Sequence, residues 1–567
     1  MVKSARPPSA KELMTLSKTL TTRIAFLRDA HPVSPLVLSI ATLVFVFYID
    51  NDTFWSIGSD VFAGHPLSFG AYILAVFTLM LSFFSVFAFP WVVKPFLAFI
   101  VILSAITSYY MDNLGVIIDR DMIQNVMVTT VTESKHLITA SFVLHNLVFG
   151  VLPVLVIFAV KIKPHGRTRT LLTPVVSTLL CLGLTVGLLW SDMKAYASIL
   201  RERKDFMSSF QPGMPIVGAI RYAKMMGRSA NVTVAKSGED AVKGPAYGPD
   251  AKPVLTIVVA GETARAQNFS LNGYGVETNP ELAKLPVVSF TNVSSCGTAT
   301  AVSLPCMFSK FTRSTYSFEN GIATESVLDV MAHAGFHVEW WDNNTGDKAI
   351  ASRLTKRSLT NTPNTEFCAA GECMDGIFLK EVEDFADAIT QDTVLVLHQI
   401  GSHGPTYYLR YPETFEKFKP SCRTAEFKSC TPQEIANAYD NTIAYTDKVL
   451  ADIIRVLQSR DALATAMIYM SDHGESLGEG GMYLHGAPYF MAPDTQTKVP
   501  AILWMSQNFE DQLGIDRRCM AAKAGEALSH DNLFHSLLGM LDIQTAERDN
   551  ALDIFATCKN ATKGLSN

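Results

Sequence analysis

The chain has 567 residues, of which 48% are hydrophobic, and a formal net charge of −6. This length favours more than one domain, and the mean hydropathy of +0.20 favours a membrane part. The acidic charge balance gives no sign of a nucleic-acid-binding surface, so we expect no nucleic-acid partner.

Five long apolar runs precede residue 191, at 36–49, 67–89, 96–111, 140–160 and 171–190. Most approach the roughly 20 residues that a helix needs to cross about 30 Å of hydrocarbon. The first run is short, and we expect it to extend back through residues 24–27 with a tilt. A cleaved signal peptide is disfavoured because the preceding segment is long and four more spans follow. The sequence therefore predicts five transmembrane helices rather than buried helices of a soluble protein.

The cations indicate how these helices are oriented. The N-terminal tail carries six Lys and Arg residues, and the short connection at 161–169 carries four more. The first connection has none, and the third has only Arg120 and Lys135. Because positive loops stay in the cytoplasm, an odd number of spans exports everything after Trp190. We expect a multi-pass protein of the bacterial inner membrane with a periplasmic domain.

The composition changes twice after the last span. Residues 191–228 mix Met, Tyr, Ile and Phe with Lys and Arg, which is typical of amphipathic helices along a membrane interface. Residues 229–253 are rich in Gly, Pro, Ser, Ala and Lys, and they read as a flexible linker. The expected domains are thus a transmembrane part (1–190), a bridge with a linker (191–253) and a catalytic part (254–567).

Short apolar runs in the exported part predict strands, namely VLTIVVA at 254–260, TVLVLH at 393–398, AMIYM at 466–470 and VPAILW at 499–504. Continuous apolar strands between helix-like stretches favour a mostly parallel sheet covered on both faces. The predicted class is a three-layer α/β sandwich. Polar residues follow the first three strands, among them Glu262, His403 and Asp472 with His473, and such residues should converge at the carboxyl ends of the strands.

Glu262, Asp472 and His473 supply three ligands for a tetrahedral zinc ion and leave the fourth position for a reacting group. The small residues SCGTATA at 295–301 offer that group. Either Thr298 or Thr300 could lose its proton on zinc and attack phosphorus. Each feature alone would equally suit a helix cap or a hydrogen-bonded turn, but their joint appearance at three strand ends favours a metal site.

Of nine cysteines, eight lie in the exported part and Cys181 lies in a span. An even number in an oxidising compartment indicates disulfides. The close spacings suggest three pairs, which are Cys296 with Cys306, Cys368 with Cys373, and Cys422 with Cys430. Whether Cys519 pairs with Cys558 is left open. Zinc-binding thiolates are disfavoured because no CxxC repeat is present.

Five segments in one chain carry a family resemblance: VVAGETAR at 258–265, SCGTATAVSLPCMF at 295–308, WDNN at 341–344, IGSHGP at 400–405 and SDHGESLGE at 471–479. Together they resemble the signatures of the lipid A phosphoethanolamine transferases, of the EptA and mobile colistin-resistance type, over nearly the whole chain. The resemblance implies a catalytic domain of the alkaline phosphatase and sulfatase type.

The resemblance also implies roles for single residues. The second threonine of the Cys-Gly-Thr-Ala-Thr segment, Thr300, becomes the nucleophile and the fourth zinc ligand beside Glu262, Asp472 and His473. The family pairs the cysteine before the nucleophile with the one ten residues on, which agrees with Cys296 and Cys306. His403 and His485 match histidines near the transferred phosphoryl group, as general acid or base or as ligands of a second zinc ion.

Further matches concern the substrate. Asn344 and Lys348 correspond to substrate-contacting positions. Asn125, Thr129 and Glu133 recur every four residues, so on a helix they would share one face. The family uses such a face to hold the ethanolamine head group, although the spacing alone would equally suit the solvated side of a helix.

The implied activity is transfer of phosphoethanolamine from phosphatidylethanolamine to a phosphate of lipid A through a covalent threonine intermediate, by a monomer, with lowered surface charge and polymyxin resistance as the consequence. The alternatives are a phosphoethanolamine or phosphoglycerol transferase acting on another envelope glycan, or a non-enzymatic membrane sensor. A sulfatase is disfavoured because the segment 306–310, CMFSK, lacks the C/S-x-P-x-R context of its nucleophile.

Overall fold

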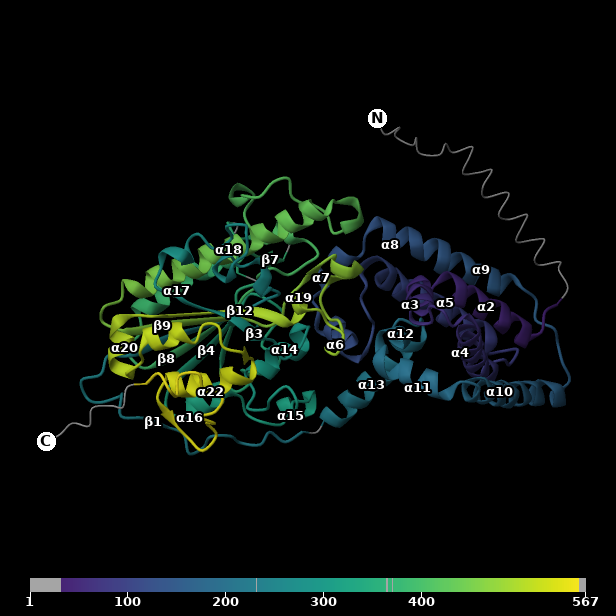
Figure 1. Ribbon diagram of the computed structural model, residues 1–567, viewed down its shortest axis with the longest axis horizontal. Helices are drawn as coiled ribbons and strands as arrows, with labels where there is room; N and C mark the ends of the chain where they lie inside the picture. The colour runs from purple at the N-terminus through teal and green to yellow at the C-terminus, as the bar shows by residue number, and fades with distance from the viewer. Residues whose placement is uncertain (1–31, 231, 361, 364–365, 370, 560–567) are drawn as a thin grey trace. The chain divides into compact units, whose positions relative to one another are not determined.

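The computed structural model describes residues 32–559 except 231, 361, 364–365 and 370 (Figure 1). The chain divides into two compact units. One comprises the residues up to Gly115 and Ala140–Ile216, and the other comprises Val116–Thr139 and the residues from Val217 onward. The connection between the third and fourth apolar runs therefore belongs to the same unit as the residues from Val217 onward.

The first unit is α-helical. Among the described residues, four helical stretches are long and apolar enough to cross a membrane: α4 (Pro66–Val86), α5 (Val93–Leu114), Ala140–Ala159 and α10 (Arg167–Trp190). The stretch Ala140–Ala159 consists of α8 (Ala140–His145), a π-helical turn (Asn146–Val151) and α9 (Leu152–Ala159). A fifth span results if α2 (Pro35–Ile49) and α3 (Asp52–Val61), which are bent by 70°, count as one. The predicted extension through residues 24–27 lies outside the described residues.

Three shorter helices follow where amphipathic helices are expected, namely α11 (Met193–Glu202), α12 (Lys204–Ser208) and α13 (Gly213–Ser229). The first two are attached to the helical unit by aromatic side chains. The ring of Phe206 stacks on that of Phe54 with 4.7 Å between centroids, and Tyr196 is buried in the same cluster. Burial of such large rings contributes roughly 1.5–3 kcal/mol each, which fixes this segment against the spans.

The second unit is built on an eight-stranded sheet with the order β13-β3-β12-β9-β2-β8-β4-β5. Its centre consists of β9 (Ala464–Ser471), β2 (Val254–Gly261), β8 (Thr393–His398) and β4 (His337–Asp342), which run parallel. The remaining strands are β3 (Val288–Ser294), β12 (Lys498–Met505), β5 (Thr355–Ser358) and β13 (Leu528–Ser529). β12 runs antiparallel to both of its neighbours. The predicted mostly parallel sheet is confirmed, and the strand at 499–504 is its antiparallel member.

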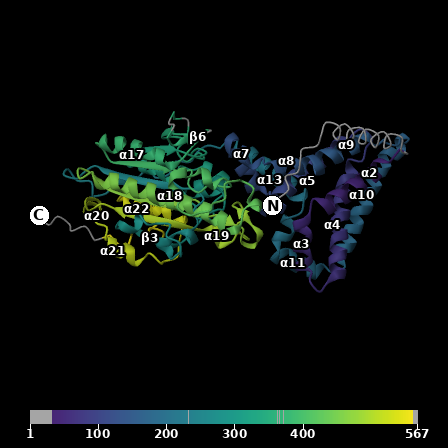
Figure 2. The same ribbon diagram turned by 90° about the horizontal axis from the view of Figure 1, so that it is seen from above.

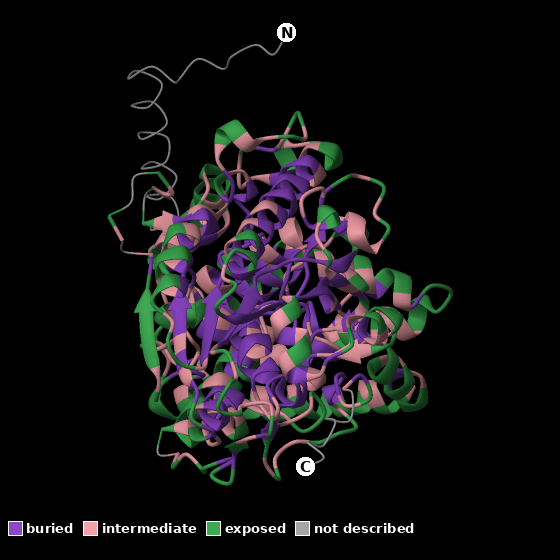
Figure 3. Ribbon diagram, turned by 90° about the vertical axis from the view of Figure 1, so that its left-hand side faces the viewer, coloured by how far each residue is buried: buried purple, intermediate pink, exposed green. Residues whose placement is uncertain are grey.

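Helices cover both faces of this sheet. In Figure 1, α17 (Phe378–Asp387) and α18 (Pro432–Gln458) lie on one side of the strands and α16 (Val327–His333) and α22 (Asp531–Met540) on the other. Figure 2 shows α17, α18 and α22 from above. Every residue of β2, β8 and β9 is buried, so the strands form the purple interior in Figure 3. The unit is the predicted three-layer α/β sandwich.

The expected linker makes contacts with the second unit. Ala235 forms a bridge with Thr324, and β1 (Val242–Lys243) pairs with β14 (Ile543–Gln544). The Nζ atom of Lys243 lies 2.6 Å from Asp392 Oδ2. Residues 235–243 are therefore held along the α/β unit by backbone pairing and an ion pair.

Four disulfides join residues of the second unit. They are Cys296–Cys306, Cys368–Cys373 and Cys422–Cys430, the pairs that close spacing suggests, and Cys519–Cys558, which spacing leaves open. All nine cysteines are among the described residues, and Cys181 is the one outside a disulfide. Each closed loop lowers the conformational entropy of the unfolded chain and thereby stabilises the fold.

Candidate metal centre and nucleophile

The site lies at the carboxyl ends of three adjacent strands, β9, β2 and β8. Their register sets Gly261 opposite Ser471 and Ala260 opposite His398. The next residues of β2 and β9, Glu262 and Asp472, therefore leave the sheet side by side. This edge is where parallel α/β sheets gather their reactive groups.

Glu262, Asp472 and His473 offer ligand atoms that all lie within 4.8 Å of one another. The Nε2 atom of His473 lies 3.4 Å from Glu262 Oε1 and 3.4 Å from Asp472 Oδ2. Its Nδ1 atom lies 2.9 Å from the carbonyl oxygen of Gly474, so Nε2 is the ring nitrogen that faces the carboxylates. The Oδ2 atom of Asp472 is buried without a hydrogen-bond partner in the described part of the chain. These three side chains could hold a cation, and one imidazole with two carboxylates suits zinc.

The charges of the cluster favour a cation. Burial alone would raise the pKa of Glu262, but the hydrogen bond and charge of His473 hold it well below its usual value. Burial would lower the pKa of His473, and the charges of Asp472 and Glu262 raise it to about 9. Two carboxylates buried this close repel each other, and a positive charge between them relieves that repulsion.

Thr300 is the first residue of α14 (Thr300–Met307). Its hydroxyl oxygen lies 3.0 and 3.1 Å from the two carboxylate oxygens of Glu262 and 3.2 Å from His473 Nε2. The hydroxyl of Thr298 instead donates to the carbonyl oxygen of Ala487 at 2.6 Å. Of the two threonines that the sequence left open, only Thr300 has its hydroxyl in the cluster.

Two neighbours fix the carboxylate of Glu262. Thr263 donates its hydroxyl to Oε1 at 2.5 Å, from a backbone held at φ 57°. Asn344 donates its side-chain amide to Oε2 and to the carbonyl oxygen of Gln399, both at 2.8 Å. The structure thus brings Asn344, expected at the substrate, against a metal-ligating carboxylate.

The two histidines of the resemblance lie beside the cluster. The Nε2 atom of His403 is 3.1 Å from Glu133 Oε1, while its Nδ1 atom is buried without a described partner. The Nδ1 atom of His485 is 2.9 Å from Glu475 Oε2, and its ring centroid is 4.3 Å from that of His473. Burial would lower the pKa of His403, but the charge and hydrogen bond of Glu133 raise it to about 9.

The helix expected to carry Asn125, Thr129 and Glu133 on one face is interrupted, so that expectation is wrong. Asn125 lies in α6 (Arg120–Val128), Thr129 ends it with an extended backbone, and Glu133 lies in α7 (Val131–Leu137). The side chain of Thr130 accepts a hydrogen bond from the backbone N–H of Glu133 and so caps a new helix. The β-branched run from Val128 to Val131 also disfavours one continuous helix.

Lys348 lies near the same carboxylates. Its Nζ atom donates to the carbonyl oxygen of Thr345 at 2.8 Å. Burial lowers the pKa of Lys348, and the charges of Glu262, Asp342 and Glu133 oppose that effect. A cation held near the cluster without an ion pair of its own can receive an anionic group.

The sequence reasoning missed two supporting carboxylates. Glu475 orients His485 and accepts a hydrogen bond from the Tyr407 hydroxyl; its signal was its place in the Asp-His-Gly-Glu segment. The carboxylate oxygens of Asp375 accept hydrogen bonds from the backbone nitrogens of Ile400 and Gly401, each at 2.9 Å, and so fix the turn before His403. No local pattern marks Asp375, because its partners lie 25 residues away.

Cys306 lies in a disulfide with Cys296, so it presents no free thiol for the chemistry of a sulfatase. The fold and the site define a chain with apolar, membrane-length helices and a three-layer α/β unit in which the Thr300 hydroxyl lies against three side chains that could hold a metal ion.

Comparison with known proteins places the chain within this class. Residues 255–543 match the family model described as sulfatase, and residues 76–226 match the one described as phosphoethanolamine transferase EptA/EptB. The chain is 41% identical over 483 residues to the phosphoethanolamine transferase EptA of Escherichia coli K12, covering 84% of this chain and 87% of that protein. It is 36% identical over 536 residues to the phosphatidylethanolamine transferase Mcr-1 of Escherichia coli, covering 91% and 96%.

A solved structure is also similar over nearly the full length. The integral membrane protein lipooligosaccharide phosphoethanolamine transferase A (EptA) from Neisseria meningitidis matches with a TM-score of 0.89 and 35% identity, covering 94% of this chain and 100% of that chain. The chain therefore belongs to the EptA and Mcr family of phosphoethanolamine transferases.

Proposed function

We propose that the protein transfers phosphoethanolamine from phosphatidylethanolamine to a phosphate of lipid A, with Thr300 as the covalent nucleophile. The observation that carries this proposal is the Thr300 hydroxyl oxygen, 3.0 Å from Glu262 Oε1 and 3.2 Å from His473 Nε2. A hydroxyl between a carboxylate and an imidazole in a buried site has the activated arrangement that nucleophilic catalysis requires.

The names of relatives support lipid A as the acceptor. One relative, 27% identical over 448 residues, is the Kdo(2)-lipid A phosphoethanolamine 7''-transferase of Salmonella typhimurium. The similar structure from Neisseria meningitidis is named for lipooligosaccharide. One name gives Kdo(2)-lipid A and the other gives lipooligosaccharide as the molecule that is modified.

The donor step follows from the side chains. The Thr300 oxygen forms a bond to phosphorus, the bond between phosphorus and the diacylglycerol oxygen breaks, and the threonine proton passes to the neighbouring carboxylate–imidazole cluster. His403, kept protonated beside Glu133, or His485 gives a proton to the departing diacylglycerol oxygen. The unpartnered Nδ1 atom of His403 is free for this donation.

The acceptor step reverses these roles. A phosphate oxygen of lipid A forms a bond to the same phosphorus, and the bond to the Thr300 oxygen breaks. The histidine that gave its proton takes one from the acceptor, and the threonine hydroxyl recovers its own proton. Diacylglycerol and phosphoethanolamine-modified lipid A are the two products.

Zinc fits the proposed site. Glu262, Asp472, His473 and the Thr300 hydroxyl would hold one ion, and His403 with His485 would hold a second if one binds. When bound, the ion lowers the pKa of the threonine hydroxyl and neutralises charge on the phosphoryl oxygens. We assign the orientation of the phosphoryl group to Lys348 and Asn344, and contact with the ethanolamine to Asn125, Thr129 and Glu133.

We place the protein in the bacterial inner membrane as a monomer, with residues 1–190 as the anchor, 191–253 as the connection and 254–567 as the periplasmic catalytic domain. Four disulfides support an oxidising compartment. The transferred group adds positive charge to an anionic lipid, so attraction of cationic polymyxins should weaken.

Mass spectrometry of lipid A from cells with and without the protein tests this function. We expect a phosphoethanolamine adduct with the wild type and none with Thr300→Ala. An adduct that persists with Thr300→Ala would exclude the covalent role of Thr300, and no adduct with the wild type would exclude lipid A as the acceptor.

A further inference from the structure

A cavity of about 200 Å³ lies in the second unit beside the segment 298–301, which precedes and follows Thr300. Thr298, Ala299 and Ala301 form one of its walls, and Gly486 and Gln124 form others. These residues are the chain neighbours of Thr300, His485 and Asn125. The cavity is thus built by the same segments as the proposed catalytic site, while Thr300 itself points to Glu262.

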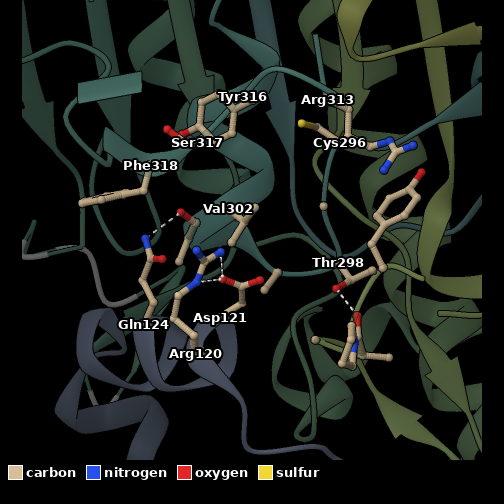
Figure 4. A pocket seen from close by; sticks show the side chains of 17 residues that line it. Arg120, Asp121, Gln124, Cys296, Thr298, Val302, Arg313, Tyr316, Ser317 and Phe318 are labelled. Atoms are coloured by element: carbon tan, nitrogen blue, oxygen red, sulfur yellow. Dashed lines mark hydrogen bonds and ion pairs between the residues drawn. The ribbon is translucent and has the colours of Figure 1, made fainter. Parts of the chain in front are cut away.

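The cavity contains two guanidinium groups, which Figure 4 shows on opposite sides in that view. Arg120 donates its Nε–H to Asp121 Oδ1 at 2.7 Å, so its charge is balanced locally. Arg313 lies over the ring of Tyr489, 4.2 Å from its centroid. In the described part of the chain, no carboxylate forms an ion pair with the Arg313 guanidinium. The Asp531 carboxylate is close, since its Oδ1 accepts the backbone N–H of Arg313 at 2.8 Å. The guanidinium itself lies over the Tyr489 ring and lines the cavity, where its N–H groups can meet an anion.

The walls are fixed by contacts that do not involve Arg313. Gln124 is buried and donates to the carbonyl oxygen of Ala301 at 3.3 Å. Gly486 donates its backbone N–H to the carbonyl oxygen of Thr298 at 2.7 Å, in a left-handed conformation with φ 89°. This positive φ is strained for residues with a Cβ atom, so glycine is favoured there. The cavity is therefore preformed, which reduces the entropic cost of binding.

We propose that this cavity binds an anionic phosphate group of the glycolipid acceptor, with Arg313 as its main contact. This inference rests on the proposed function. The donor has one phosphate, and that phosphate must lie at the Thr300 oxygen during the first step. An anion bound here belongs to the second substrate, and a planar guanidinium stacked on a ring presents its donors in the fork that matches phosphate oxygens.

The test separates the two half-reactions of the full-length protein in detergent. Diacylglycerol release from fluorescent phosphatidylethanolamine without acceptor reports the donor step, and mass spectrometry with increasing lipid A reports the acceptor step. For Arg313→Gln we expect the KM for lipid A to rise about tenfold or more, as expected for loss of a charged hydrogen bond. The loss should be confined to the step that needs the acceptor. The KM of Arg313→Lys for lipid A should lie between that of the wild type and that of Arg313→Gln.

Arg357→Gln is the matched control, because Arg357 also stacks on an aromatic ring, 5.2 Å from the centroid of Trp341, and does not line the cavity. Its KM for lipid A should equal that of the wild type. An unchanged KM in Arg313→Gln, or an equal loss in both half-reactions, would overturn the assignment of the cavity alone. Wild-type protein that releases diacylglycerol but modifies no lipid A would overturn the proposed acceptor and the cavity assignment with it.

Discussion

Replacing Glu133 by Gln removes the carboxylate that keeps His403 protonated. His403 Nε2 and Glu133 Oε1 are 3.1 Å apart, and both side chains are largely buried, with 10% and 13% exposure. Burial alone would lower the pKa of His403, and the charge and hydrogen bond of Glu133 raise it to about 9. Without that charge, the pKa should return to about 6.5 or fall below it.

The difference between a pKa of about 9 and one of about 6.5 corresponds to roughly 3 kcal/mol in favour of the protonated imidazole of His403. Because the folded-state pKa is raised, the pair stabilises the protein fully below about pH 6.5 and stops doing so as the pH rises through about 9. If protonated His403 donates to the leaving oxygen, the Glu133→Gln donor step should be about tenfold slower at pH 7.5, since about a tenth of the imidazole remains charged. In the pH profile of the donor step, the fall in rate on the alkaline side should move from about pH 9 to about pH 6.5 or below.

Release of diacylglycerol from fluorescent phosphatidylethanolamine, measured from pH 5.5 to 10, checks this shift. A Glu133→Gln profile that still falls near pH 9 would refute the role of the ion pair. A rise in KM without a shifted limb would mean that Glu133 acts on the ethanolamine ammonium instead. In a His403→Gln background, Glu133→Gln should leave the pH profile unchanged, because the group whose pKa it sets is absent.

Three further outcomes are expected. Thr300→Ser should keep measurable diacylglycerol release because it retains a hydroxyl on the same Cβ, and Thr300→Ala should lose it at least a hundredfold; equal rates would contradict nucleophilic attack by Thr300. Asp472→Asn should lower the zinc content measured by elemental analysis of the purified protein. Wild-type protein treated with a chelator should lose zinc and thermal stability together. Zinc retained by Asp472→Asn would place the ion elsewhere. Phe534→Ala removes a fully buried ring in α22 and should cost about 3–5 kcal/mol in unfolding free energy. The control is Phe490→Ala: Phe490 is 55% exposed, so its removal should leave the melting temperature nearly unchanged. Similar melting temperatures of the two variants would show that Phe534 does not support the core.

The sequence could predict those parts of the structure that local patterns determine. Continuous apolar runs marked β2, β8 and β9, since a strand buried on both faces excludes polar residues along its whole length. The first residues after two of these strands then had to meet at one edge, and Glu262 does meet Asp472 there. The antiparallel direction of β12 could not be predicted, because its burial is the same in either direction.

Contacts between distant segments left no local signal. The turn before His403 depends on Asp375, which caps two backbone N–H groups from another part of the fold. The break at Thr129 is different, because it has a local cause: the hydroxyl of Thr130 accepts the backbone N–H of Glu133, three residues on, and so starts a new helix. The four-residue spacing of Asn125, Thr129 and Glu133 does not register such a cap.

The pairing of Glu133 with His403 has a consequence for how the chain is organised. Residues 116–139 lie in sequence between two apolar spans, yet their contacts assign them to the unit that contains the metal-binding cluster. A fragment that begins after the last span keeps Glu262, Thr300, Asp472 and His473 but lacks Glu133. A soluble domain of the Neisseria relative, which matches 58% of this chain at 41% identity, has been crystallised by itself. In this chain the candidate cluster and the carboxylate beside His403 thus come from different segments: the residues after the last apolar span supply Glu262, Thr300, Asp472 and His473, and the connection between two spans supplies Glu133.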